Sequence, residues 1–269
     1  MEIIHRVNAN NKMAFKADLD RVGFKYEYEK SSFGKWISFE IAESDLLWPV
    51  IGDLISKYNV FDWVYTRFTE TELKCASYVG MGASHTSGYP KPDGDFGYLD
   101  VTYDLSEYCA EDGTGAKQKG PFRIRSEPRW GRKHVFHLNW VFDEFFVPPE
   151  VWRSVFKQFG VSCLPVIHHR TGKELETVVQ LNISALASSA LRTENLPYET
   201  CSCGRKKCLP VTRGFFPSFV EPQSETILKS QEYFGSGGQA FRAVLVSSRV
   251  FQEIKRQGLK GFHFKPMFE

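Results

Sequence analysis

Residues 198–210, YETCSCGRKKCLP, bring together thiols that could hold a metal ion. Cys201, Cys203 and Cys208 fall within eight positions, and Gly204 directly follows the second of them. A structural zinc takes four tetrahedral ligands, and closely spaced cysteines on a tight turn can reach one ion with little loop strain. Glycine lets the backbone turn its N–H groups toward the sulfurs. This stretch therefore predicts one half of a metal site.

A second turn of the same kind offers the other half. The segment CAEDG begins at Cys109 and ends at Gly113, and Asp112 stands where a second cysteine would complete a C-x-x-C-G pattern. A carboxylate oxygen is an acceptable, though less common, zinc ligand. We call residues 109–113 the first knuckle and residues 201–204 the second knuckle. They are about 90 residues apart, so a shared site requires Cys109 and Cys203 to lie close together in the fold.

The sequence leaves two interpretations of this pair open. In one, the knuckles bind Zn²⁺ as in a zinc ribbon, and the candidate ligands are Cys109, Asp112, Cys201 and Cys203, with Cys208 in reserve. In the other, the knuckles are turns that bind no metal, because neither has the C-x-x-C-G spacing. A redox centre is weaker, since no pattern puts C-x-C at a helix N-terminus, where a thiolate is stabilised. Cys75 and Cys163 are expected to be core residues.

Basic residues near both knuckles predict a binding surface. Residues 117–133 contain seven lysines and arginines against one acid, Glu127. The formal net charge of the whole chain is only +2, which favours a protein partner or plain solvent exposure over nucleic acid. Aromatic and arginine side chains dominate interface hot spots. The expected contact residues are Arg129, Trp130, Arg132, Arg205, Lys206 and Lys207.

Catalytic patterns are weak along the chain. Asp93, Asp95, Asp100 and Asp104 could serve a metal-dependent enzyme, but the segment PDGD has the composition of a turn. No nucleophile elbow, phosphate-binding loop or dinucleotide fingerprint is present. The segment GSGGQ, residues 235–239, is expected to be a flexible loop, and we call it the glycine loop. The sequence favours a non-catalytic binding protein over this enzyme and over a nucleic-acid-binding zinc-ribbon protein.

The elements that must position these residues predict an α+β protein of two domains. Residues 1–84 alternate as βαββαβ, the ferredoxin-like arrangement, and are expected to pack with a larger mixed, sheet-rich domain, residues 85–269, that carries the knuckle pair. Strands are expected over residues 98–105 and, unbroken, over residues 134–147. The N-terminus has no secretory pattern and no apolar run is long enough to span a bilayer, so a cytoplasmic protein is expected.

The two knuckles and the C-terminal segment together resemble a known family. Bacterial double-CXXCG motif proteins pair one knuckle in the middle of the chain with a second further on, and close with a strand, a helix and a G-hydrophobic-x-F-x-P tail. The counterparts here are CAEDG, CSCGRKK and SSRVFQEIKRQGLKGFHFKPMFE, so the resemblance covers roughly residues 85–269. Some members are identified as immunity proteins that bind and neutralise a toxin delivered between bacteria. The resemblance therefore implies a cytoplasmic, non-catalytic binder with a toxin partner.

Overall fold

The chain folds into two compact units of mixed α+β structure. A computed structural model describes residues 1–10, 12–31 and 34–267. Unit 1 comprises Met1–Glu72 and Val211–Phe215, and unit 2 comprises Leu73–Pro210 and Phe216–Glu269. The division falls after Glu72 and not after residue 84, because β5 (Tyr78–Ala83) pairs with two strands from the C-terminal part of unit 2.

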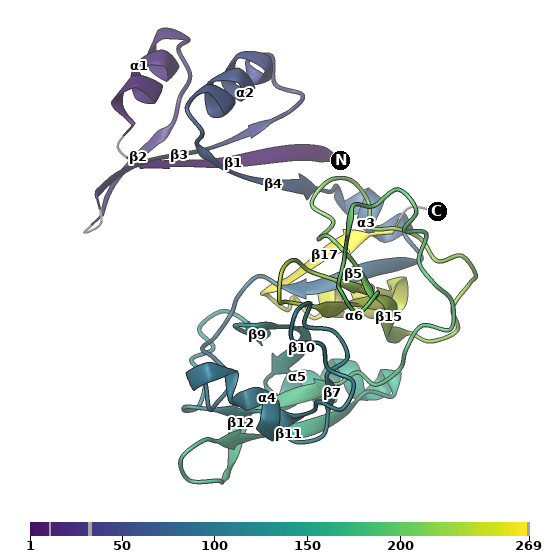
Figure 1. Cartoon of the computed structure of the whole chain (residues 1–269). Coiled ribbons are helices and arrows are strands. Elements are labelled where there is room, and N and C mark those ends of the chain that lie inside the picture. Colours follow the sequence, from purple (N-terminus) through teal and green to yellow (C-terminus); the bar gives the residue numbers. More distant parts are fainter. Residues whose placement is uncertain (11, 32–33, 268–269) are drawn as a thin grey trace. The chain divides into compact units, whose positions relative to one another are not determined.

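Unit 1 is one antiparallel sheet with two helices on one of its faces (Figure 1). Its strands follow the order β2-β3-β1-β4. Alternate side chains of β1, such as Val7 and Ala9, point to the helical face, where they meet Phe15 and Leu19 of α1 and Ile51 of α2. The elements are β1 (Glu2–Asn10), α1 (Met13–Arg21), β2 (Glu27–Ser31), β3 (Gly34–Ala42), α2 (Trp48–Lys57), β4 (Phe61–Arg67) and, at the division, α3 (Glu70–Cys75).

Unit 2 contains a six-stranded sheet of order β13-β14-β15-β16-β5-β17 and a five-stranded sheet of order β8-β11-β12-β10-β9. A two-stranded sheet joins β6 to β7. The remaining strands are β6 (Tyr103–Asp104), β7 (Lys117–Gln118), β8 (Arg123–Ile124), β9 (Phe136–Leu138), β10 (Val141–Val147), β11 (Ser162–His168), β12 (Glu174–Asn182), β13 (Tyr198–Thr200), β14 (Lys206–Cys208), β15 (Ile227–Phe234), β16 (Phe241–Ser247) and β17 (Phe262–Pro266). The helices are η1 (Gly94–Phe96), α4 (Tyr98–Thr102), α5 (Pro149–Val151), η2 (Trp152–Phe156), η3 (Lys157–Phe159) and α6 (Ser248–Arg256).

Two hydrophobic cores lie on opposite faces of the five-stranded sheet. Phe145 of β10 belongs to the larger core, which it shares with Val246 of β16 and Phe251 of α6. Its neighbour Phe146 belongs to the smaller core, together with Tyr98. Successive residues of a strand point to opposite faces, so β10 separates the two cores. None of the helices within the described residues combines the length and the apolar character needed to cross a bilayer.

Two expected strands are wrong, and both errors concern the smaller core. Residues 98–105 form α4 followed by the short β6. Residues 134–147 form a hairpin and not one strand, because the chain turns between Leu138 and Val141, which face each other across β9 and β10. Trp140, the second residue of this two-residue turn, has φ 69°, a left-handed conformation that is uncommon for a bulky side chain.

The buried imidazole of His137 makes the stability of unit 2 depend on pH. Its Nδ1 lies 2.9 Å from the Glu144 carbonyl oxygen, which only accepts, and its Nε2 lies 3.0 Å from the Ala83 N–H, which only donates. The imidazole is therefore neutral, and burial lowers its pKa to about 4. In the unfolded chain His137 is protonated near its ordinary pKa of ~6.5. The folded state is therefore fully stabilised by the neutral imidazole above pH ~6.5, and this stabilisation is lost as the pH falls toward about 4.

We expect acidification from about pH 7 to about pH 4.5 to remove ~2–3 kcal/mol of stability through His137 alone. Urea unfolding followed across this range measures the effect, and His137→Gln should flatten the pH dependence by that amount. His168→Gln, at the last residue of β11, is the matched control. An unchanged slope in His137→Gln would contradict the assignment.

Candidate metal centre

Side chains from the two knuckles converge on one point in unit 2. The ligand atoms of Cys109, Asp112, Cys201 and Cys203 all lie within 4.8 Å of one another. The Cys109 Sγ is 3.4 Å from the Cys201 Sγ and 3.6 Å from the Cys203 Sγ. Sulfurs around a tetrahedral zinc, each about 2.3 Å from the ion, lie about 3.8 Å apart. The predicted proximity of Cys109 and Cys203 is confirmed, and the cluster can hold a metal ion.

Backbone hydrogen bonds shape both knuckles. In the first, between β6 and β7, the Gly113 N–H donates to the Cys109 carbonyl at 2.8 Å, and the Cys109 N–H donates to the Thr114 carbonyl at 2.9 Å. In the second, the turn of the β13–β14 hairpin, the Cys201 N–H donates to the Arg205 carbonyl at 3.0 Å. Gly113 has φ 80°, and a Cβ there would lie 2.4 Å from the Gly238 carbonyl oxygen. Only glycine permits this approach.

The Asp112 carboxylate is oriented as a ligand would be. Its Oδ1 accepts the Thr114 N–H at 2.8 Å and the Thr114 hydroxyl at 2.7 Å. Its Oδ2 is buried and has no hydrogen-bond partner. A buried carboxylate oxygen without a partner costs free energy, and a cation shared with three sulfurs would remove that cost. Burial acts to raise the pKa of Asp112, but the hydrogen bonds from Thr114, helped by the Cys109 thiol and the Lys207 ammonium, outweigh it and the pKa is lowered.

Contacts outside the four ligands hold the knuckles together. The Glu111 carboxylate accepts hydrogen bonds from the Ser202 hydroxyl and, at 3.2 Å, from the Cys201 thiol. The Arg205 guanidinium reaches back to the first knuckle, where it donates to the Glu107 carbonyl at 2.7 Å and to the Thr114 hydroxyl at 3.1 Å. The geometry of the cluster is therefore supported by groups that sequence analysis did not identify as part of the site.

The thiols differ in their ease of ionisation. The pKa of the Cys203 thiol is lowered, chiefly because the backbone N–H of Arg205 donates a hydrogen bond that favours the thiolate. The Cys203 N–H favours the Cys201 thiolate, but burial and hydrogen bonds with Cys203, Cys109 and Glu111 outweigh it and raise the pKa of Cys201 to about 12. Metal binding requires thiolates, so an incoming ion must displace the Cys201 proton.

Other predicted ligands and contacts lie elsewhere. Cys208 is on β14 outside the cluster, and burial raises the pKa of its thiol. Cys75 is exposed at the end of α3, contrary to the core position expected for it. Within the described residues, the knuckle cluster is the only group of three or more side chains suited to a metal, so Asp93, Asp95, Asp100 and Asp104 form no such group.

Lys207 is buried, which corrects its assignment to a partner-binding surface. Its side chain is 1% exposed. The ammonium donates to the Asp112 carbonyl at 2.9 Å, the Gln239 carbonyl at 3.0 Å and the Gly237 carbonyl. It thereby joins the first knuckle to the glycine loop, which was expected to be flexible. No spacing rule distinguishes this lysine from its exposed neighbour Lys206.

The remaining contact candidates differ in exposure. Arg129 and Arg132 are exposed. Trp130 is half-buried, with its Nε1 3.1 Å from the Thr177 carbonyl and its ring centroid 5.1 Å from that of Phe136. Lys206 is exposed, and its ammonium lies 4.9 Å from the centre of the Tyr198 ring. The two arginines are thus two of the four exposed cations among these candidates, the others being Arg205 and Lys206.

No known family model matches this chain, and no curated protein matches it in sequence.

Lys207 and Lys206 form a natural pair for a stability test. Lys207→Met should lower the free energy of unfolding by about 2–5 kcal/mol, because the three carbonyl groups become buried without a donor. Lys206→Met should cost less than about 1 kcal/mol, since only an exposed cation–π contact is lost. Chemical denaturation of both variants measures the difference. Equal effects would contradict the structural role of Lys207.

Proposed function

We propose that this chain is a zinc-binding, non-catalytic binding protein that neutralises a bacterial toxin by direct contact, as in the immunity proteins it resembles. The observation that carries the proposal is the convergence of Cys109, Asp112, Cys201 and Cys203 from two knuckles about 90 residues apart. We interpret this pair as a zinc ribbon. We also interpret unit 1 as ferredoxin-like, which its strand order β2-β3-β1-β4 supports.

Zinc is the metal that this ligand set favours. Three thiolates and one carboxylate form a soft, four-ligand, tetrahedral set, and hard oxygen-preferring cations such as Mg²⁺ bind such sulfur-rich sites poorly. A catalytic zinc keeps one position for water or substrate, whereas a structural zinc has four protein ligands. The four ligands here favour the structural role, and free thiols suit a reducing cytoplasm.

The binding surface that we propose centres on residues 129–132. Arg129 and Arg132 are exposed, while the Trp130 ring is fixed by its contacts with Thr177 and Phe136. A fixed backbone that presents two arginines loses little entropy on binding, and an acidic partner surface would match the charge. The nucleic-acid alternative is weaker because Lys207 is buried and Arg205 bonds to the first knuckle.

We expect the protein purified under reducing conditions to contain one zinc ion per chain by elemental analysis. Cys203→Ser should lose most of the metal and lower the melting temperature, since a ligand that binds only the folded state at about 1,000 times its Kd stabilises by about 4 kcal/mol. Cys75→Ser, an exposed thiol outside the cluster, should retain the zinc. A metal-free wild-type protein that zinc does not stabilise would overturn the zinc assignment.

The partner is tested by co-purification from the native host followed by mass spectrometry. A captured toxin should bind the purified chain directly, and the double variant Arg129→Glu, Arg132→Glu should weaken binding at least about tenfold, because each reversal places like charges across the interface. Arg153→Glu, at another exposed arginine of unit 2, is the control. Catalytic turnover by the chain, or toxicity unaffected by its co-expression, would contradict the proposal.

A further inference from the structure

A cavity of about 560 Å³ opens in unit 2 beside the first knuckle. This volume is typical of small-molecule sites. Two carboxylates, Asp95 and Asp143, are among its lining residues, which include no lysine, arginine or histidine. We call it the aromatic cavity, because its lining includes Phe96, Tyr98, Tyr103, Tyr108, Trp140 and Tyr233.

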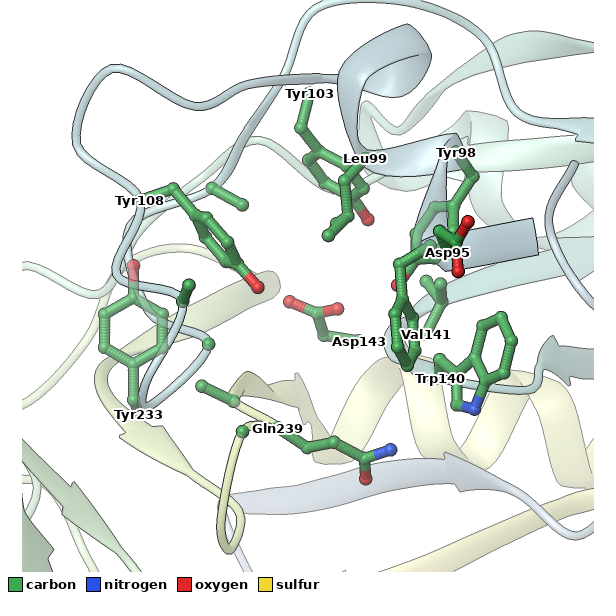
Figure 2. A pocket seen from close by; sticks show the side chains of 16 residues that line it. Asp95, Tyr98, Leu99, Tyr103, Tyr108, Trp140, Val141, Asp143, Tyr233 and Gln239 are labelled. Carbon is green, nitrogen blue, oxygen red and sulfur yellow. The ribbon is translucent and has the colours of Figure 1, made fainter. Parts of the chain in front are cut away.

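The Asp143 carboxylate lies at the middle of this cavity. Figure 2 shows it among the aromatic rings, with the Tyr108 side chain directed toward it from the first knuckle. Its Oδ2 accepts a hydrogen bond from the backbone N–H of Arg242 at 3.3 Å and lies 3.6 Å from the Lys229 ammonium. These contacts fix the orientation of the carboxylate, which otherwise faces the cavity.

Asp143 shares its nearest cation with a second carboxylate. The Lys229 ammonium, 3.6 Å from Asp143 Oδ2, also bonds to Glu144, a buried carboxylate outside the cavity lining. The Arg242 guanidinium stacks over the Tyr233 ring, 4.2 Å from its centre, and donates to the Ser230 carbonyl at 2.8 Å. The lining itself therefore presents two carboxylates and no cationic side chain. In a partly desolvated cavity this arrangement favours a cationic guest.

The aromatic rings are arranged around Trp140. The centroid of the Trp140 ring lies 4.7 Å from that of Phe96 and 6.0 Å from that of Tyr98, and the Tyr98 ring is stacked at 19°. Burial, with help from Tyr108 and Asp143, raises the pKa of Tyr98 to about 12, so its phenol is neutral at ordinary pH. Neutral electron-rich rings attract a cation without the cost of stripping water from a second anion.

Backbone strain is concentrated at the same place. Four non-glycine residues in the described part of the chain have positive φ, and three of them line the cavity: Asp95 (48°), Phe96 (55°) and Trp140 (69°). Such conformations are energetically unfavourable and cluster at ligand sites, where the surrounding structure maintains them. The strained residues supply one carboxylate and two rings of the cavity.

We propose that the aromatic cavity binds a small organic cation of the alkylated ammonium class, with the charged nitrogen held between Asp143 and the aromatic faces. The lining contains none of the candidate zinc ligands and none of residues 129–132, so binding of the cation can be measured whether or not the chain binds a toxin.

Calorimetric titration of the full-length protein with choline tests the proposal. Choline should bind with a Kd below about 1 mM, and its neutral isostere 3,3-dimethylbutan-1-ol should bind at least about tenfold more weakly, because only the cation gains from the carboxylate and the rings. A trimethyllysine amide, titrated in parallel, distinguishes a free small cation from a protein side chain. Tighter binding of either probe than of the isostere supports the class.

Two variants locate the site. Asp143→Asn should weaken choline binding about tenfold or more, and Asp95→Asn, at the exposed rim, should weaken it about threefold. Asp100→Asn, on α4 but outside the cavity lining, should bind as the wild type does. Melting temperatures identify any variant that fails to fold, and Asp95→Asn remains informative if Asp143→Asn does. Equal binding of choline and its isostere, no binding of either ammonium probe, or unchanged binding in folded variants would overturn the proposal.

Discussion

The buried ammonium of Lys207 is the interaction on which the centre of unit 2 depends. A lysine with 1% exposure is tolerated because three backbone carbonyls accept from it and the Glu199 carboxylate lies 3.7 Å from its ammonium. Those carbonyls belong to the first knuckle and to the glycine loop, while Lys207 itself is on β14, directly after the second knuckle. One side chain therefore fixes the relative positions of three segments that are far apart in the sequence. The glycine loop is consequently held by its neighbours, even though its composition suggests flexibility.

This arrangement makes the proposed zinc site and the aromatic cavity share a wall. Tyr108, Ala110 and Gly113 line the cavity, and they lie next to the candidate ligands Cys109 and Asp112 along the chain. Gly238 and Gln239 close the same wall from the glycine loop. Because Gly113 lies against the Gly238 carbonyl with no space for a side chain, a shift of the first knuckle must change the cavity. A metal that orders the first knuckle would thus also order the cavity, without touching a ligand bound there.

Local patterns in the sequence identified the structural features that are determined by residues close together along the chain. The order of elements in unit 1 and the four clustered candidate ligands follow from periodicity, turn residues and cysteine spacing. The hairpin at Trp140 and the helix α4 were missed, since continuous apolar and aromatic runs are compatible with strand and helix alike. Lys207 was placed on the surface because a run of basic residues ordinarily is solvated; its burial depends on carbonyls contributed by distant segments. The cavity has no sequence signal at all, as its lining comes from six or more separate stretches.

The altered spacing of the knuckles has a physical explanation in the contacts that surround them. Two standard C-x-x-C-G turns would supply all four thiolates and could depend on the metal to bring them together. Here Arg205 and Glu111 also connect the turns through hydrogen bonds that require no ion. The Asp112 carboxylate adds a second observation to the convergence of the ligands, because its Oδ2 is buried without a hydrogen bond of standard geometry and lies in a cluster with three thiols. The Cys109 thiol can interact with this carboxylate, but only a cation would join it to all three sulfurs at once, and this is why we favour a metal centre over a pair of metal-free turns.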